Sequence, residues 1–257
     1  MIFPDAWHRI IDHFHNDPKT LEKCSLVSGS WAYHAQKHLF NEIKFQGQSQ
    51  LLLWEKDFPD PLKSPARHTK LLCLIFSQAT GITEAHIGVI KSFTNVTHLK
   101  VWVGDSRYYE PGSLDVLHNL LPAVGALRVH FNFRVHLSHL FALIGLSPSI
   151  KDLDIYGRKI YNNRDDFKLP STLPAFTGTL AIGCDLDGIM GPLLRLPPNS
   201  LRFRKIVWRF RSSYDESSVR HMTDLIERCS DTLEYIDFDL AMLGGSRPFG
   251  FFDGFSI

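Results

Sequence analysis

Residues 96–101 read Val-Thr-His-Leu-Lys-Val and place their apolar side chains in the pattern apolar-x-x-apolar-x-apolar. The same pattern returns at four later places, which begin at Val124, Ile150, Phe203 and Leu233, and residues 72–74 and 180–182 follow it in part. The central apolar residues stand at positions 72, 99, 127, 153, 180, 206 and 236, so the intervals are 27, 28, 26, 27, 26 and 30 residues. Such regular intervals indicate a structural repeat.

Each repeat is expected to contain one strand and one helix. The apolar residues alternate within each pattern, as in a strand with one buried face. Segments between the patterns, such as 113–121 and 221–226, carry apolar residues at helical spacing. Ile43 and Phe45 precede the first pattern by a similar interval and are candidates for an eighth strand. Because one unit cannot bury its apolar face alone, we expect the units to stack, with parallel strands on one side and helices on the other.

Right-handed connections between such parallel strands would produce a curved, right-handed solenoid. The interval resembles that of long leucine-rich repeats, although the Asn or Cys that usually follows the strand is missing. A doubly wound α/β sheet is the alternative, since it also alternates strands and helices, but it needs no fixed interval. The sequence therefore predicts an α/β fold in which residues 46–257 form a leucine-rich-repeat-like solenoid.

Residues 1–45 do not follow this repeat, and their pattern is helical. Trp7, Ile10 and Phe14 fall on one face of a helix, and Asp17-Pro18 suits the start of a second helix with Asp17 as its N-cap. Six short elements then occur in the order that is typical of the F-box: Phe3-Pro4-Asp5, Ile10-Ile11, Asn16-Asp17-Pro18, Cys24-Ser25-Leu26-Val27-Ser28, Trp31 and Leu39-Phe40. The segment resembles the F-box family, with Phe3 in place of the usual Leu and Gly29 in place of a basic residue.

F-box proteins are substrate receptors of cullin–RING ubiquitin ligases, in which the F-box binds a small adaptor subunit and the downstream domain holds the substrate. The resemblance implies a three-helix F-box over residues 1–45 and a non-catalytic receptor that recruits an unknown protein for ubiquitination. Three short helices cannot bury all the large apolar side chains of this segment, so some are left for a partner. The expected adaptor contacts are Phe3, Pro4, Trp7, Ile10, Ile11, Phe14, Leu21, Leu26, Val27 and Trp31. The alternative is that they cap the first repeat, which would make the chain a protein-binding scaffold without ligase attachment.

The substrate is expected on the strands, because residues between the buried positions of each strand point to the opposite, solvent-facing side of the sheet. This rule places three kinds of side chain there in neighbouring repeats: cations, aromatic rings and one carboxylate. The predicted substrate contacts are Lys100, Trp102, Arg128, His130, Asp154, Tyr156 and, in a secondary role, Arg209. Trp, Tyr and Arg are typical hot-spot residues of protein interfaces. A merely solvated sheet face remains the alternative.

Composition and motifs argue against several other functions. The chain has 28 Lys and Arg against 27 Asp and Glu, so its net charge of +1 implies neither a nucleic acid nor a membrane surface as partner. The basic run from Arg202 to Arg211 contains aromatic residues that could stack on bases, but strand residues with solvated flanks explain it as well. His34 and His38 lack the Glu of the zinc-protease motif, and no P-loop, nucleophile elbow or dinucleotide fingerprint occurs. We expect no catalytic residues, metal or cofactor.

The sequence also predicts where the protein resides. No apolar stretch approaches the roughly 20 residues that a membrane helix needs. Charged residues near the N-terminus interrupt what would be the apolar part of a secretory signal, and the four cysteines form no C-x-x-C pair. We therefore expect an intracellular protein, cytoplasmic or nuclear, with reduced thiols.

Overall fold

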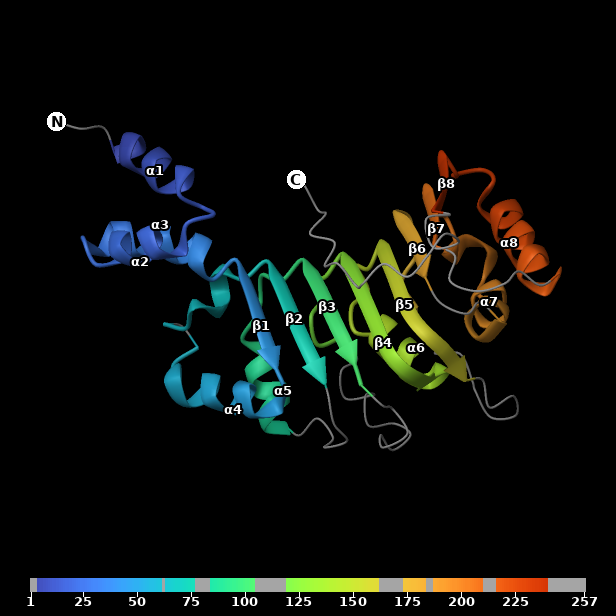
Figure 1. Cartoon of the computed structure of the whole chain (residues 1–257), viewed down its shortest axis with the longest axis horizontal. Coiled ribbons are helices and arrows are strands. Elements are labelled where there is room, and N and C mark those ends of the chain that lie inside the picture. Colours follow the sequence, from blue (N-terminus) through green and yellow to red (C-terminus); the bar gives the residue numbers. More distant parts are fainter. Residues whose placement is uncertain are drawn as a thin grey trace, which may run out of the picture.

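The computed structural model describes residues 4–61, 63–76, 84–104, 119–161, 173–183, 187–209 and 216–239. Over these residues the protein is α/β, and eight strands form one parallel sheet in the order β1 to β8 (Figure 1). The strands are β1 (Glu42–Gln46), β2 (Leu71–Phe76), β3 (His98–Val103), β4 (Ala126–His136), β5 (Asp152–Tyr161), β6 (Thr179–Gly183), β7 (Lys205–Arg209) and β8 (Tyr235–Asp239).

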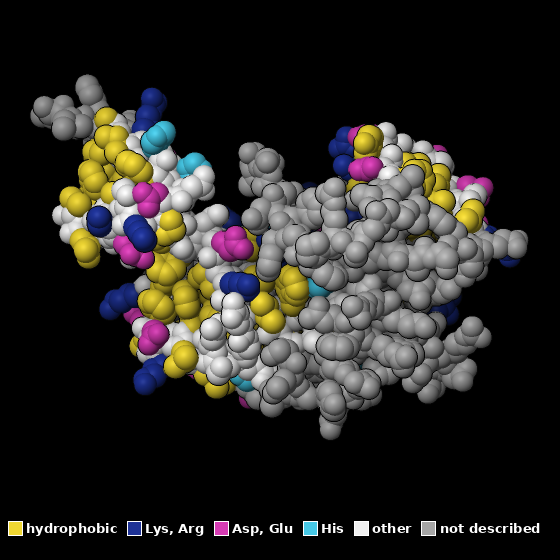
Figure 2. Space-filling view, in the orientation of Figure 1, with side chains coloured by type: hydrophobic (Ala, Val, Ile, Leu, Met, Phe, Trp, Pro, Cys, Tyr) yellow, Lys and Arg dark blue, Asp and Glu magenta, His cyan; other side chains and the backbone are white. Residues whose placement is uncertain are grey.

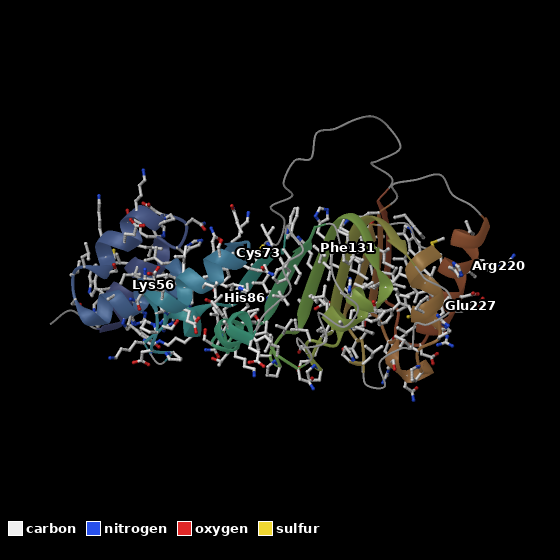
Figure 3. All side chains as sticks on the ribbon, turned by 90° about the horizontal axis from the view of Figure 1, so that it is seen from below. Lys56, Cys73, His86, Phe131, Arg220 and Glu227 are labelled. Carbon is white, nitrogen blue, oxygen red and sulfur yellow. The ribbon has the colours of Figure 1, made fainter. Side chains whose placement is uncertain are left out.

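Eight α-helices accompany these strands in the described residues. Three precede the sheet and the other five lie between strands: α1 (Pro4–His13), α2 (Pro18–Ser25), α3 (Gly29–Leu39), α4 (Gln48–Asp57), α5 (Glu84–Lys91), α6 (Leu137–Ile144), α7 (Asp187–Leu194) and α8 (Glu216–Cys229). In Figure 3, Lys56 on α4 and His86 on α5 mark the helical layer, Cys73 marks the sheet, and Arg220 and Glu227 mark α8 at the far end. No helix in the described ranges is both long and apolar enough to cross a membrane.

The predicted repeat positions form one row across the sheet. Leu72, Leu99, Leu127, Leu153, Leu180, Ile206 and Ile236 pair in that order on successive parallel strands, and Ile43 pairs with Leu72 as an eighth member. The predicted placement on adjacent parallel strands is therefore confirmed. A doubly wound sheet would reverse its strand order at a switch point, and the described sheet does not. Ile236 differs from the others in being only partly buried.

The core lies between the sheet and its helices. Alternate strand residues such as Leu99 and Val101 pack there with residues from the helices and turns, and Phe93, Phe141 and Phe203 are fully buried within it. The predicted helix at 221–226 is part of α8. Of the helix predicted at 113–121, residues 113–118 lie outside the described part, and residues 119–121 form no helix.

The three N-terminal helices have a small core of their own. Ile11, Leu21, Cys24 and Ala35 are buried there, and Trp7, Phe14, Trp31 and Leu39 pack against them. The predicted capping of α2 is present, since the Thr20 amide donates to Asp17 Oδ1 at 3.2 Å and Pro18 opens the helix. The sheet begins at Glu42, so residues 42–45, which the sequence assigns to the N-terminal unit, belong to the first strand.

Candidate functional site

The predicted substrate contacts lie on the sheet face that points away from the core. Lys100, Arg128 and Asp154 pair across β3, β4 and β5, and Trp102, His130 and Tyr156 pair across the same strands two residues later. Their strand neighbours Leu127, Leu153 and Ile155 are buried on the core side. The six residues therefore form two adjacent rows, one mainly charged and one aromatic.

Asp154 is the centre of an ion-pair network on this face. Arg128 Nε donates to Asp154 Oδ2 at 2.8 Å, and Arg209 Nη1 lies 3.7 Å from Asp154 Oδ1. The Asp154 side chain is only 15% exposed. Burial raises the pKa of this carboxyl, and the two arginines oppose that effect. Asp154 thus holds two arginines that come from strands on either side of it.

Arg209 reaches this network because β6 carries little side-chain bulk beside Asp154 and Tyr156. On the outer face of β6, Ala181 pairs with Asp154 and Gly183 pairs with Tyr156, and the third outward residue, Thr179, pairs with Lys205. The Tyr156 ring lies over Gly183, since a Cβ at Gly183 would be 2.8 Å from two ring atoms. The Arg209 guanidinium lies 4.9 Å from the centre of the same ring. The sequence predicts a secondary role for Arg209, but the structure joins it to the central residues.

The aromatic row is in contact along its length. The rings of Trp102 and His130 meet edge to face at 4.2 Å between centroids, and those of His130 and Tyr156 lie 6.3 Å apart. All three side chains are partly exposed. The row therefore leads from Trp102 on β3 to the Arg209–Asp154 pair, and a bound segment could contact both ends.

The close approach of Tyr156 to Gly183 can be tested by substitution. Gly183→Ala should lower the free energy of unfolding by about 1–3 kcal/mol, because the new methyl group would displace the Tyr156 ring. Gly88→Ala is the matched control, since a Cβ there meets nothing within 4 Å and Ala favours helix α5. Urea titration of both variants measures the effect. Equal stabilities of Gly183→Ala and the parent protein would show that Tyr156 does not need this space.

The N-terminal unit carries a second candidate surface. Ile10 on α1 is 52% exposed, and Leu26 and Val27, between α2 and α3, are 84% and 62% exposed. Figure 2 shows hydrophobic side chains gathered on this unit, at the end of the molecule beyond β1. Three strongly exposed aliphatic side chains on so small a unit are available to a partner.

The other predicted adaptor contacts have different places. Ile11 and Leu21 are fully buried in the unit's own core, so they stabilise the helices and do not face a partner. Trp7, Phe14 and Trp31 are partly buried against that core, and Trp7 stacks on Trp31 at 5.8 Å between ring centroids. Phe3 lies outside the described residues, and Pro4 begins α1.

Histidines join α1 to α3 in the same unit. The rings of His8 and His34 lie 3.5 Å apart between centroids, and His38 Nε2 is 2.7 Å from Asp12 Oδ1. The predicted helical pair His34 and His38 therefore makes contacts across helices. No group of three or more His, Cys, Asp or Glu that could hold a metal is found in the ranges that the structure describes.

These contacts predict a pH dependence of stability. Burial lowers the pKa of His34 from 6.5, and His8 and Lys37 lower it further, while Asp12 opposes them. The unfolded chain therefore binds this proton more readily, so the stability should be full above pH 6.5 and fall as the pH drops below it. His34→Gln should flatten the decline between pH 7.5 and 5 in denaturant titrations, whereas His13→Gln, at an exposed position, is the control. An unchanged decline in His34→Gln would contradict this assignment.

In the described part of the basic run, residues 202–209, the aromatic side chains are not available to stack on bases. Phe203 is fully buried and stacks on Phe176 at 5.4 Å, and Trp208 is buried as well. Arg204 makes two hydrogen bonds to Glu234. Phe210 and Arg211 lie outside the described residues. The described part of this run is thus explained by the strand and its ion pairs.

No protein-family model matches this chain, and no functionally curated protein matches it. A functional assignment therefore rests on the two surfaces described above.

Proposed function

We propose that the protein is an F-box substrate receptor of a cullin–RING ubiquitin ligase, with an F-box over residues 1–45 and a leucine-rich-repeat-like solenoid over residues 46–257. In this proposal the helices α1–α3 bind the small adaptor subunit. The outer face of the sheet binds the protein substrate. The receptor itself contributes no catalytic residue, because its task is to hold the substrate near the ligase.

The observation that carries this proposal is the exposure of Ile10, Leu26 and Val27. These residues belong to the motif elements Ile10-Ile11 and residues 24–28, through which the segment resembles the F-box. A unit that only capped the sheet would turn such side chains towards it, yet Leu26 and Val27 rank among the most exposed large apolar residues that the structure describes. In the free protein these apolar side chains are in contact with water, which is unfavourable. A partner that covers them would gain about 25 cal/mol of binding free energy for each Å² of apolar surface buried.

The outer sheet face supports the substrate part of the proposal. It combines Trp102, Tyr156 and Arg209, the residue types that most often dominate protein interfaces. These residues lie on strands that the parallel sheet holds at fixed spacing. A bound segment would therefore meet a prearranged surface.

The adaptor part can be tested by co-purification. Leu26→Asp with Val27→Asp should reduce recovery of the recombinant adaptor subunit by tenfold or more, because binding would bury two unpaired carboxylates in an apolar contact. Pro4→Ala with Ile10→Ala should also weaken recovery. Leu52→Asp with Leu53→Asp is the matched control, since these two leucines are also apolar and exposed, at 45% and 56%, but lie on α4.

Circular dichroism should show that the two Asp variants remain folded, because the mutated leucine and valine side chains face solvent. Undiminished adaptor recovery by the Leu26→Asp, Val27→Asp variant would overturn the F-box assignment. The same result would leave the alternative of a binding scaffold without ligase attachment.

A further inference from the structure

The N-terminal helices join the sheet almost without a connecting segment. Helix α3 ends at Leu39 and β1 begins at Glu42, so only Phe40 and Asn41 lie between them. Leu39 packs against the core of the helical unit, whereas Phe40 packs against the core of the sheet. The Asn41 carbonyl accepts a hydrogen bond from the Leu71 amide of β2 at 3.0 Å. The C-terminal end of α3 is therefore fixed to the sheet.

A second contact between the helical unit and the sheet lies farther back on α3, at Tyr33. The Tyr33 ring meets the His68 ring edge to face at 5.1 Å between centroids, and the Arg67 guanidinium lies 5.7 Å from the Tyr33 ring centre. His68 and Arg67 belong to η1 (Pro65–His68), a short 3-10 helix between α4 and β2. The Lys37 ammonium, one turn later on α3, lies 4.7 Å from the same ring centre. The Tyr33 ring is thus held by groups from both α3 and η1.

The short helix η1, which contacts Tyr33, is itself anchored in the sheet. Ala66 of η1 is fully buried and belongs to the core of the sheet. Ser64 caps η1, since its hydroxyl oxygen accepts a hydrogen bond from the Ala66 amide at 3.2 Å. The side-chain amide of Asn95, in the turn before β3, donates to the Arg67 carbonyl at 2.7 Å. Tyr33 therefore packs against an element that is held by the sheet and not by the N-terminal helices.

We propose that Tyr33 is a positioning residue, which fixes the direction in which the N-terminal helices extend from the sheet. Tyr33 lies six residues before Leu39, which corresponds to about 9 Å along the helix axis. Two attachments this far apart hold a helix in one direction, whereas the attachment at Phe40 alone would act as a pivot. Relative motion is the expected behaviour where two parts of a chain share only a small contact. Loss of the Tyr33 ring should therefore free the helical unit to swing.

The consequence of this contact for a substrate rests on the proposed receptor function. If α1–α3 bind the adaptor and the outer sheet face binds the substrate, the direction of α3 determines where the substrate lies relative to the ligase. Tyr33 contacts η1, whereas the exposed Leu26 and Val27 lie between α2 and α3. Loss of the Tyr33 ring should therefore change the placement of the helical unit and leave adaptor recovery unchanged.

The distance between two spin labels on the full-length protein tests this inference. Labels at Lys19→Cys on α2 and Lys151→Cys before β5 report the position of the helical unit relative to the sheet, and both residues are exposed. Labelled protein without these two substitutions gives the background from the native cysteines. The distance distribution from double electron–electron resonance should be narrow in the otherwise unchanged protein and at least twofold broader in Tyr33→Ala. Tyr33→Phe keeps the ring and should keep the narrow distribution.

Tyr33→Ala should remain folded by circular dichroism, because Tyr33 is 44% exposed and Ala favours a helix. Tyr33→Leu, which keeps an apolar side chain without the ring, is a second variant that should broaden the distribution as well. Equal widths in these variants and the parent protein, or a broad distribution in the parent protein, would overturn the inference. Loss of adaptor recovery at an unchanged width would also overturn it, since Tyr33 would then belong to the adaptor surface. The distances do not depend on an adaptor, so failure of the F-box assignment would appear only in the recovery experiment.

Discussion

Replacing Leu153 with Ala should lower the free energy of unfolding by about 3 kcal/mol, within the range of 2–5 kcal/mol for buried leucines. Leu153 lies on β5 in the middle of the sheet, where it pairs with Leu127 on one side and Leu180 on the other. All three are buried at 1% exposure or less. The neighbouring strands hold the backbone in register, so the space left by the shortened side chain cannot close fully.

Urea titration followed by circular dichroism measures this loss. Leu52→Ala is the control, because Leu52 is exposed on α4 and its truncation should change stability by less than about 0.5 kcal/mol. If Leu153→Ala were as stable as Leu52→Ala, the row of buried residues would not form the core of the sheet.

Asp154→Ala should cost a similar amount, about 3 kcal/mol, for a different reason. The substitution leaves Arg128 and Arg209 facing each other without the carboxylate that separates them. We expect the lower end of the 3–5 kcal/mol seen for broken buried pairs, since about a quarter of the Arg128 side chain and a third of the Arg209 side chain reach solvent.

Asp154→Asn is the matched control for this prediction. Its amide oxygen can still accept the hydrogen bond from Arg128 Nε. Burial disfavours the charged form of Asp154 and so raises its pKa, and the uncharged Asn side chain does not have this cost. The Asn variant should therefore be more stable than the Ala variant in the same titration. Equal losses in the two variants would mean that Asp154 contributes through its charge alone, because Asn keeps the size and the hydrogen-bond acceptor of the carboxylate.

The spacing of apolar residues was sufficient to predict the order and register of the parallel strands, because the register of such a repeat is determined mainly by the need to bury the apolar residues of every strand on the same face. Leu99, Leu127 and Leu153 come at nearly constant intervals, and each must turn the same face to the core. A shift by one residue would expose a whole apolar row. Ile236 shows the limit of the pattern, since it keeps the register on β8 but is only partly buried.

The reach of long side chains could not be predicted in the same way. In the sequence, Ala181 and Gly183 add no functional group to the strand face that carries the predicted substrate contacts. In the structure their small size lets Tyr156 and Arg209 meet above β6. Such a contact depends on the space that small residues on a neighbouring strand leave. The pattern of residues within a single strand does not predict that space.

The helical unit shows a related limit. Ile10 and Ile11 are adjacent in the F-box-like motif, yet Ile10 is half exposed and Ile11 is fully buried. Successive residues on a helix point about 100° apart, so the orientation of the helix decides which of the two faces the core. The motif predicts both residues as adaptor contacts, and only packing against α2 and α3 distinguishes them.

Because the strands follow one another in sequence order, the number of strands between two sites sets the distance between them. The N-terminal helices lead directly into β1, and Asp154 lies on β5, four strand spacings or about 19 Å away. Gain or loss of one 27-residue unit between the N-terminal helices and β5 would change the distance from those helices to Asp154 by one strand spacing, about 4.8 Å. Every remaining strand would keep a parallel neighbour. In a receptor, the number of such units would set how far the substrate is held from the ligase, independently of which side chains recognise it.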